Sequence, residues 1–521
     1  MRLSSYLNKA KMALRYGFGL PRFFLKPLSL EECYALVRRR VEEREENFLA
    51  QLRRSVYPNP QSPYARLLRW AGCEYEDAER MVRQKGLEKT LKKLSDAGVY
   101  ITIREYKGKT PIERAGLSFQ AQPEDFDNPL VVPSLEGRSS GTRGSPVRTK
   151  IDFDFLRERA AQDAVQFDVI GVYGSPYVFW MPTLRNVICA AKAGMPLVKW
   201  FFPLSTTRNK LASYYTIAIG KLLGCHLPWP EHVSYDQAGR IAAWLAQNRL
   251  TTPKIVVKTF PSSAARVCMA AREAGLDISG THFLTDGEPL TPSREGVIKA
   301  SGCRVISQYA STETGKIGFG CINSTGDDVH LLKGAIAVMQ QLRRVGSTGV
   351  TVNALQVTSL LPSAPKVLIN MENGDYGTLE NRPCGCKFDE LGFTDHLSHI
   401  RSYEKVTSEG MTFFAGDLAK IIEEILPARF GGSPLDYQAI EEESRNGITH
   451  LTLLVSPRLG KTDEAGLINT VLEELKNTGG SSRMMAKVWQ EAGTVRVRRE
   501  EPRASGRGKV FSFQVETVSS H

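Results

Sequence analysis

Between residues 126 and 400, short apolar segments alternate with amphipathic ones, a pattern that few folds accept. The apolar segments are Asp168–Val172, Pro196–Phe201, Lys254–Lys258, Thr281–Thr285 and Arg304–Ser307. The segments with apolar residues at helical spacing are Thr183–Ala193, Asn209–Leu223, Tyr235–Gln247, Ser262–Ala274 and Ser293–Ala300. Such alternation favours stacked sheets covered by helices. The sequence therefore predicts an α/β fold for this part of the chain.

The chain is 521 residues long, which exceeds one ordinary core and predicts at least two domains. Residues 1–125 are expected to form a mainly helical extension that packs on a core of residues 126–401. In the extension, helical spacing covers Leu30–Val56, Tyr64–Ala71, Tyr75–Lys85 and Lys89–Ala97, and Val99–Glu105 alternates like a strand. Residues 402–521 combine helices and strands in a compact α+β pattern, with helices expected at Asp417–Leu426 and Glu464–Lys476 and strands at Thr449–Ser456, Val495–Arg499 and Val510–Thr517.

The net charge of +12 comes almost entirely from the two ends of the chain. Residues 1–30 hold six Lys or Arg and no acid, and residues 483–509 hold eight against three Glu. No nucleic-acid partner is needed to explain this distribution, and none is expected. Residues 1–26 are basic and amphipathic, which suits packing on the body, peripheral contact with an anionic membrane or a targeting presequence; we favour packing.

The cysteines and the hydropathy indicate the compartment. Nine scattered cysteines, an odd number, favour a reducing compartment over a disulfide framework, and the cytoplasm is the default expectation. No apolar run reaches the roughly 18 residues that a bilayer span needs.

A run rich in glycine and hydroxyl groups lies between residues 139 and 146. Its two glycines and one arginine can direct backbone N–H groups, hydroxyls and a positive charge at phosphate oxygens. Neither the P-loop spacing nor the dinucleotide-fold spacing is present. The candidate phosphate-binding residues are Ser139, Ser140, Gly141, Thr142, Arg143 and Gly144.

This run resembles the phosphate loop of the adenylate-forming superfamily, which includes the acyl-CoA synthetases. Further motifs follow in the order found in that superfamily, and the resemblance is strongest to its phenylacetate-CoA ligase-like branch. The resemblance covers about residues 70 to 515; after the loop its motifs are Asp286-Gly287-Glu288-Pro289, Tyr309-Ala310-Ser311-Thr312-Glu313, Gly374-Asp375, Arg401 with Gly410, and Gly508-Lys509.

The resemblance implies a role for each motif in making an acyl-adenylate from ATP and a carboxylic acid. Thr312 and Glu313 would act on phosphate and Mg²⁺, Arg401 would reach ribose or phosphate oxygens, and Lys509 would bridge the reacting carboxylate and the α-phosphate. The remaining nucleotide contacts would come from Gly287, Glu288, Pro289, Tyr309 and Asp375. The fold implied is a large adenylate-forming domain with a small mobile lid that carries Lys509.

The sequence departs from the superfamily pattern at three positions. Arg143 stands where Thr is frequent, and Ser145 stands where many members have Lys, so one cation has moved by two positions. Tyr403, followed by Glu404, replaces the usual acidic hinge residue. The sequence therefore does not determine which residues of the phosphate loop contact the nucleotide, or which residue acts as the hinge.

A separate group of cysteines and histidines has the spacing of a metal site. Cys384 and Cys386 form a Cys-x-Cys turn, which presents two thiolates to one ion and suits tetrahedral zinc. One closure adds Cys321 and His330, as in the zinc-bearing relatives of the branch, and the other adds His396 and His399; we favour the first. Four protein ligands would make the metal structural.

Three functions remain open from the sequence. The leading one is an AMP-forming acid–thiol ligase that uses ATP and Mg²⁺ and passes the acyl group to coenzyme A. The second keeps the adenylation but transfers the acyl group to a carrier protein, a protein side chain or an amine. The third is a non-catalytic module that binds nucleotide and partners. The particular acid is not predicted, and a homodimer is left open.

Overall fold

The structure is a computed structural model. It describes residues 2–138, 147–203, 210–287, 290, 292–345, 350–402, 405–408, 411–414, 418, 420–432, 436–443, 449–478, 480–503 and 513–515.

A mixed sheet of twelve strands runs through the described part of the chain, in the order β13-β14-β15-β16-β12-β11-β10-β9-β8-β5-β6-β7. The strands from β10 to β7 are parallel, and those from β13 to β11 are antiparallel to their neighbours, β10 included. The parallel strands are β5 (Tyr177–Trp180), β6 (Leu197–Phe202), β7 (Pro230–His232), β8 (Val256–Thr259), β9 (His282–Thr285) and β10 (Arg304–Ser311). The antiparallel ones are β11 (Gly315–Phe319), β12 (Val329–Leu331), β13 (Ile336–Val345), β14 (Val350–Ser359), β15 (Met371–Asn381) and β16 (Asp395–Ser402).

Helices cover both faces of the parallel half. They are α8 (Phe153–Val169), α9 (Leu184–Lys192), α10 (Lys210–Leu222), α11 (Ala238–Arg249), α12 (Pro261–Glu273) and α13 (Pro292–Ala300), with the short η3 (Tyr235–Gln237) before α11. Along β5, Val178 and Trp180 pack into one hydrophobic core and Tyr177 and Phe179 into the other. Because all four positions are buried, the strand reads as a continuous apolar run. The predicted α/β class is confirmed.

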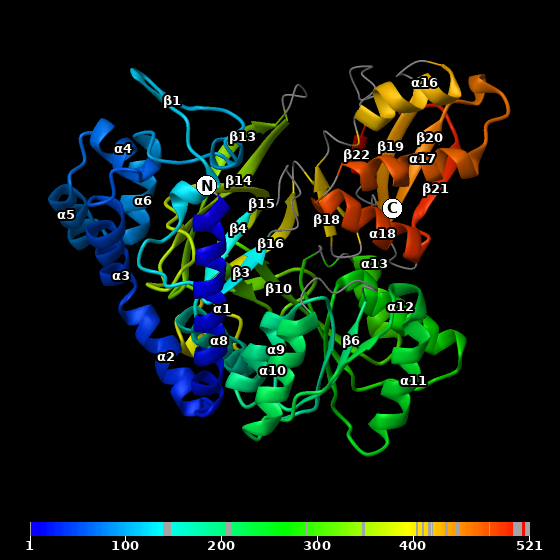
Figure 1. The fold of residues 1–521 in the computed structure, drawn as a ribbon, viewed down its shortest axis with the longest axis horizontal. Coiled ribbons are helices and arrows are strands. Elements are labelled where there is room, and N and C mark those ends of the chain that lie inside the picture. Colours follow the sequence, from blue (N-terminus) through cyan, green and yellow to red (C-terminus); the bar gives the residue numbers. More distant parts are fainter. Residues whose placement is uncertain are drawn as a thin grey trace.

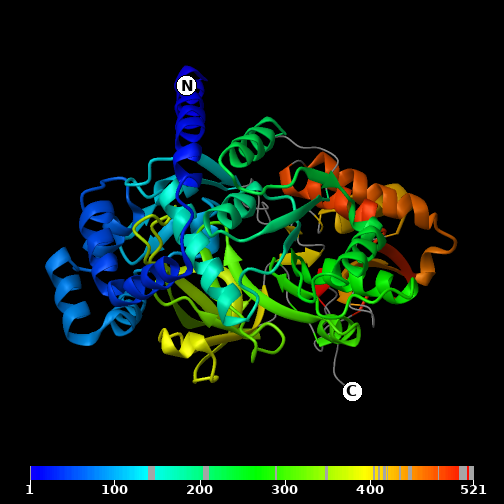
Figure 2. The same ribbon diagram turned by 90° about the horizontal axis from the view of Figure 1, so that it is seen from below.

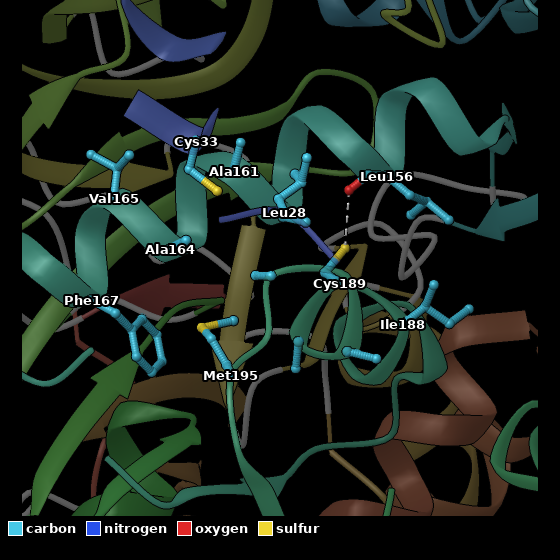
Figure 3. Packing of buried hydrophobic residues seen from close by; sticks show 14 of the residues in the cluster. Leu28, Cys33, Leu156, Ala161, Ala164, Val165, Phe167, Ile188, Cys189 and Met195 are labelled. Atoms are coloured by element: carbon cyan, nitrogen blue, oxygen red, sulfur yellow. Dashed lines mark hydrogen bonds between the residues drawn. The ribbon is translucent and has the colours of Figure 1, made fainter. Parts of the chain in front are cut away.

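The pair α8 and α9 builds much of the core on one face. Figure 3 shows Leu156, Ala161, Ala164 and Val165 of α8 and Ile188 and Cys189 of α9 in this packing. The Cys189 thiol donates to the carbonyl of Leu156 at 3.6 Å, which joins the two helices.

The N-terminal residues form a series of helices. They are α1 (Arg2–Phe24), α2 (Leu30–Glu42), α3 (Arg44–Gln51), η1 (Leu52–Val56), α4 (Pro63–Trp70), α5 (Tyr75–Lys85), α6 (Leu87–Asp96) and α7 (Ile103–Tyr106), followed by a hairpin of β1 (Ile112–Arg114) and β2 (Leu117–Phe119) and the turn η2 (Pro123–Phe126). The helices from α3 onward lie beside the antiparallel half of the sheet (Figure 1), whereas α1 and α2 pack against helices of the parallel half. The N-terminal end of α1 projects from the rest of the protein (Figure 2). Farther along α1, Tyr16, Leu20, Phe23 and Phe24 are buried against α8 and α9 and their neighbours.

Two strands expected from the sequence are wrong. Residues 103–106 of the expected strand Val99–Glu105 are helical, because Thr102 and Glu105 form a capping box that starts α7. The expected strand Asp168–Val172 is the end of α8 and the turn after it. Its apolar residues are buried as the helix terminates, which an apolar run alone does not distinguish from a strand.

The C-terminal part has a four-stranded sheet of its own, in the order β21-β20-β19-β22. Its elements are η5 (Ile421–Ile425), α16 (Leu426–Phe430), β19 (Tyr437–Glu443), β20 (Thr449–Val455), η7 (Pro457–Leu459), α17 (Glu464–Asn477), α18 (Gly480–Ala492), β21 (Val495–Arg499) and β22 (Phe513–Val515), preceded by the pair β17 (Lys405–Ser408) and β18 (Met411–Phe414). It lies over the helices that cover the parallel strands (Figure 1), and α18 contacts η3. The smaller α+β unit predicted at this end is therefore present.

Among the helices of the described ranges, none combines the length and the hydropathy that crossing a bilayer would need.

Candidate functional site

Two of the predicted motifs lie beyond the carboxyl ends of neighbouring parallel strands. Asp286 and Gly287 follow β9, and Thr312 and Glu313 follow β10. In open α/β sheets, this edge is where ligands bind. The topology therefore brings these two motifs to the part of the sheet where a ligand site is expected.

The turn between β10 and β11 has a hydrogen-bonded frame. The Thr314 N–H donates to the Ser311 hydroxyl at 3.1 Å, and the two hydroxyls lie 2.8 Å apart. Gly315 has φ of +85°, and a Cβ there would meet a ring atom of Phe155 at 2.7 Å. The turn thus requires glycine at this position.

This frame leaves Thr312 and Glu313 half-buried at the turn. Within the described ranges, the Glu313 carboxylate has neither a hydrogen bond nor an ion pair. A carboxylate of this kind is a suitable hard ligand for Mg²⁺.

Tyr309 and Asp375 are joined by a direct hydrogen bond, although 66 residues separate them in the chain. The Tyr309 hydroxyl donates to the Asp375 Oδ2 at 2.8 Å and accepts from the Asn373 amide at 2.6 Å. The Asp375 N–H donates to the Asn373 Oδ1 at 3.1 Å, and Gly374 between them has φ of +83°. The two motifs therefore form one arrangement of an aromatic ring and a carboxylate.

The backbone of Arg401 lies next to this arrangement. Arg401 is on β16 opposite Tyr376 of β15, and Asp375 pairs with Ser402. The predicted arginine and the predicted ribose carboxylate are thus on adjacent strands within one residue in register.

Several predicted residues lie outside the described residues. The run 139–146 falls between the antiparallel strands β3 (Leu135–Arg138) and β4 (Arg148–Ile151). The site residues concerned are Ser139, Ser140, Gly141, Thr142, Arg143, Gly144, Glu288, Pro289 and Lys509, and the hinge positions Tyr403 and Glu404 are also outside.

A buried charged network lies beneath this edge, and sequence reasoning missed it. The Lys258 ammonium is 2.7 Å from the Asp286 Oδ2 and also hydrogen-bonds Gln308. Lys316 donates to Gln308 at 2.6 Å and lies 3.7 Å from both Asp286 and Asp163. The signal that could have revealed it is a lysine at the end of the apolar segment 254–258.

The pKa values in this network follow from burial and pairing. Burial lowers the pKa of Lys258 to about 8, while Asp286 acts in the opposite direction. Burial alone would raise the pKa of Asp286, but Lys258 and Lys316 hold it below its ordinary value. The favoured state is an ionised carboxylate between two lysines.

The cysteines and the histidine of the favoured metal set converge on one point. Cys321 follows β11, His330 is on β12, and Cys384 and Cys386 precede the short helix α14 (Lys387–Glu390). The Cys384 and Cys386 sulfurs lie 3.2 and 3.4 Å from the His330 Nε2, and all four ligand atoms lie within 4.8 Å of one another. Three sulfurs and one imidazole nitrogen fit tetrahedral zinc.

The surroundings of the cluster orient its ligands. The His330 Nδ1 is 2.5 Å from the Phe393 carbonyl, so the ring can donate there and present Nε2 to an ion. The Asp389 carboxylate accepts from the N–H groups of Cys384 and Gly385 at 2.8 and 2.7 Å, which shapes the Cys-x-Cys turn. A hydrogen bond from Cys386 holds the pKa of the Cys321 thiol far below its ordinary value, against the effect of burial.

The two histidines of the alternative closure have different places. His396 is buried, its ring centroid lies 4.0 Å from that of His330, and its Nδ1 is 3.0 Å from the Asp328 carboxylate. His399 is exposed, and its N–H donates to Asp327. Of the two closures, the four atoms brought together are those of Cys321, His330, Cys384 and Cys386.

No protein-family model matches the chain, and no curated protein matches it in sequence. Among solved structures, an amide bond synthetase from Marinactinospora thermotolerans is similar at 12% identity, covering 77% of this chain and 70% of that one, with a TM-score of 0.40. ATP-bound MatB from Rhodopseudomonas palustris is 13% identical over 76% and 69%, with a TM-score of 0.34. The o-succinylbenzoate CoA synthetase of Bacillus subtilis is 12% identical over 73% and 68%, with a TM-score of 0.40. These likenesses are distant, so the activity has to be argued from the chain's own residues.

Proposed function

We propose that this chain is an ATP-dependent ligase of the adenylate-forming type, in its phenylacetate-CoA ligase-like branch. It activates a carboxylic acid as an acyl-adenylate with release of pyrophosphate and then transfers the acyl group to coenzyme A. The observation that carries the proposal is the hydrogen bond between Tyr309 and Asp375, which joins two sequence motifs of this resemblance beside the turn of Thr312 and Glu313.

The nucleotide is proposed to bind across this arrangement. The Tyr309 ring offers an apolar face to the adenine, and the Asp375 carboxylate accepts from ribose hydroxyls. Arg401, on the neighbouring strand, supplies a guanidinium to the ribose or the phosphates. The run 139–144 and the motif Gly287-Glu288-Pro289 complete the nucleotide contacts in this proposal.

The first step is an in-line attack of the substrate carboxylate oxygen on the α-phosphorus. A bond forms between that oxygen and phosphorus, and the bond from phosphorus to the bridging oxygen of pyrophosphate breaks. When bound, Mg²⁺ would neutralise charge on the phosphate oxygens. Glu313 would hold the ion, the Thr312 hydroxyl would donate to a phosphate oxygen, and the Lys509 ammonium would stabilise the charge that develops between the two reactants.

The second step is attack of a thiol on the acyl carbon, with AMP leaving. Coenzyme A is the proposed acceptor, and residues 402–521 are proposed to move as a lid between the steps, because Lys509 has to approach for the first and withdraw for a second substrate to enter. Zinc is proposed to bind Cys321, His330, Cys384 and Cys386 as a structural ion, because four protein ligands leave no open position.

The test is acid-dependent release of pyrophosphate over a panel of carboxylic acids. We expect one chemical class of acid to support release, and Glu313→Gln to lower the rate about a hundredfold, the scale of losing one preorganised charge. Glu424→Gln, an exposed carboxylate in the C-terminal unit, is the matched control and should leave the rate unchanged.

The outcomes separate the competing functions. If ATP binds but no acid releases pyrophosphate, the chain is a nucleotide-binding module and the proposal is wrong. If the acyl-adenylate forms but coenzyme A does not discharge it, the acceptor is a carrier protein, a side chain or an amine.

A further inference from the structure

Two arginines near the candidate site have no carboxylate partner among the described residues. Arg159 of α8 is 8% exposed, and its one hydrogen bond in that part of the chain is to the Asn186 side chain at 3.3 Å. Its Nε is buried and makes no hydrogen bond there. Arg185 of α9 is half-buried and has no hydrogen bond or ion pair with the residues that the structure describes.

Burying a cation without a partner is costly, so such groups are rare unless something compensates them. Burial, and then the repulsion of Arg159, lowers the pKa of Arg185 to about 10. The hydrogen bond from Arg159 to Asn186, the residue after Arg185, places the two arginines on adjoining parts of α8 and α9.

The arginines lie beside the charged network and not within it. Lys258 and Lys316 already take up the carboxylates of Asp286 and Asp163. Arg159 is within electrostatic range of Asp286, and Arg185 is within range of Asp286 and Glu313. Counting these groups, four cations face three carboxylates, and the two arginines remain without an ion pair to any of them in the described ranges.

Arg185 also lies where a ligand at the sheet edge could reach it. A Cβ built on Gly137 of β3 would lie 3.0 Å from the Arg185 Nη1, so the guanidinium packs against the strand that leads into the run 139–146. Arg185 is the second residue of α9, and the preceding Thr183 makes no side-chain capping hydrogen bond. The uncapped amides and the dipole of this helix start favour an anion at the same place.

The helix pair that carries these arginines is firmly held. Figure 3 shows Leu156 and Ala161 of α8 and Ile188 and Cys189 of α9 packed in the core, with the Cys189 hydrogen bond between the helices. A guanidinium pair on such helices is preorganised for a ligand.

We propose that Arg159 and Arg185 form a binding site for an anionic group of a substrate, either a carboxylate or a phosphoryl group. Two sources share this chemistry: the phosphates of ATP, and a second acidic group on the carboxylic acid. Naming ATP or the carboxylic acid as the source of the anion rests on the proposed ligase function. The existence of the anion site does not depend on that function.

The experiment measures anion binding to the full chain by isothermal titration calorimetry, with three probes. Pyrophosphate represents the phosphates, glutarate represents an acid with a second carboxylate, and butyrate is the monocarboxylate control. We expect wild type to bind pyrophosphate or glutarate, and Arg185→Met to bind the same probe at least tenfold more weakly. Arg185→Lys should recover part of the affinity, and Arg157→Gln, an exposed arginine on α8, should leave it unchanged.

The melting temperature of the ligand-free protein separates a binding role from a structural one. Because Arg185 has no partner to lose in the described part of the chain, Arg185→Met should keep or raise the melting temperature while losing the stabilisation that the anion gives. Should Arg185→Met fail to fold, Arg159→Met serves in the same comparison.

Each outcome decides something. If the arginine variants lose only pyrophosphate binding, the site is assigned to the phosphates of ATP. If they lose glutarate binding, and wild type does not bind butyrate, the site is assigned to the carboxylic acid substrate. Wild type that binds neither anion, or an affinity that the arginine variants leave intact, overturns the inference. If no acid releases pyrophosphate but arginine-dependent anion binding persists, the proposed ligase function fails and the site stands.

Discussion

The Cys/His cluster and the lysine network are both buried and polar, and they are built differently. In the cluster, the ligand atoms of Cys321, His330, Cys384 and Cys386 converge on one point. In the network, Lys258 and Lys316 flank Asp286, and Lys316 also lies near Asp163, so charges pair with charges and no ion is needed. The ligand atoms of the cluster therefore share one centre, whereas the groups of the network are arranged in pairs.

The two regions therefore differ in which of their buried polar groups lack a partner within the described part of the protein. In the proposed zinc site, a single ion would satisfy the four ligands of the cluster and tie together β12 and the turns after β11 and β15, so its binding energy would be folding energy. The network itself is paired, but Glu313 and two arginines near it have no ion pair within the described ranges, and these are the groups for which a ligand is proposed. The predictions below separate stabilisation at the first region from binding and catalysis at the second.

The largest effect is expected at the cluster. Changing Cys384→Ser together with Cys386→Ser should abolish zinc binding, which we expect to be about one ion per chain when the wild type is measured by elemental analysis. The free energy of unfolding should fall by about 5 kcal/mol or more, a part of the ~10–16 kcal/mol found for structural zinc in peptides. Denaturant titration with and without a chelator measures this change. A metal-free protein of full stability would contradict the site.

A pair of histidine variants sharpens this result. His330→Ala should lose the ion, whereas His396→Ala should keep it, because His396 is hydrogen-bonded to Asp328 and lies outside the converging set of four. The reverse result by elemental analysis would show that His396 supplies the imidazole ligand.

The next effect is expected at the network. Lys258→Met removes one partner of a buried ion pair and leaves Asp286 with Lys316 at 3.7 Å, so unfolding should become easier by about 3–5 kcal/mol. Lys254→Met, an exposed lysine in the same segment, is the control and should change little.

The double variant tests the cause. Lys258→Met with Asp286→Asn should recover much of the loss, because the uncompensated charge is gone. If the two changes simply add in the denaturation midpoint, the pair is not coupled and the network account is wrong.

The cluster was also the easier of the two to predict from sequence. A Cys-x-Cys turn limits the geometry by itself, and Cys321 and His330 were chosen by resemblance, so all four residues could be named. Predicting the network would require knowing which lysine side chains point into the protein. Lys258 ends a buried strand, Lys316 is on an antiparallel one, and neither spacing nor composition tells their direction. Helical periodicity likewise does not reveal that Arg159 is buried.

The same limit explains the errors in secondary structure. Length and apolar content alone left Asp168–Val172 ambiguous, and tertiary burial at the end of α8 decided the outcome. The capping box of Thr102 and Glu105 was visible in the sequence, and it overrode the alternation that suggested a strand.

A kinetic effect without a stability effect is expected for Lys509. Lys509→Ala should lower acid-dependent ATP–pyrophosphate exchange by about a hundredfold, or roughly 2.7 kcal/mol in the barrier, because the charge is used as the transition state forms. Lys461→Ala, an exposed lysine of the same C-terminal unit, is the control. Exchange at the wild-type rate would remove this assignment, and a matching loss of stability would make Lys509 structural.

The smallest effect is expected for Tyr309→Phe, and it tests whether the sheet edge is a ligand site at all. The variant keeps the aromatic face but removes the hydroxyl that donates to Asp375 at 2.8 Å and accepts from Asn373. The Asp375 carboxylate then loses a charge-assisted hydrogen bond that orients it, which is worth about 1.5 kcal/mol. If this carboxylate holds the ribose, ATP affinity by calorimetry should fall about tenfold, since each 1.4 kcal/mol is tenfold in a binding constant. Tyr214→Phe, an exposed tyrosine on α10, controls for loss of a hydroxyl elsewhere. Stability should fall by no more than the value of these two hydrogen bonds. A larger loss of stability with ATP affinity unchanged would mean that Tyr309 and Asp375 hold β10 to β15 and do not hold a nucleotide.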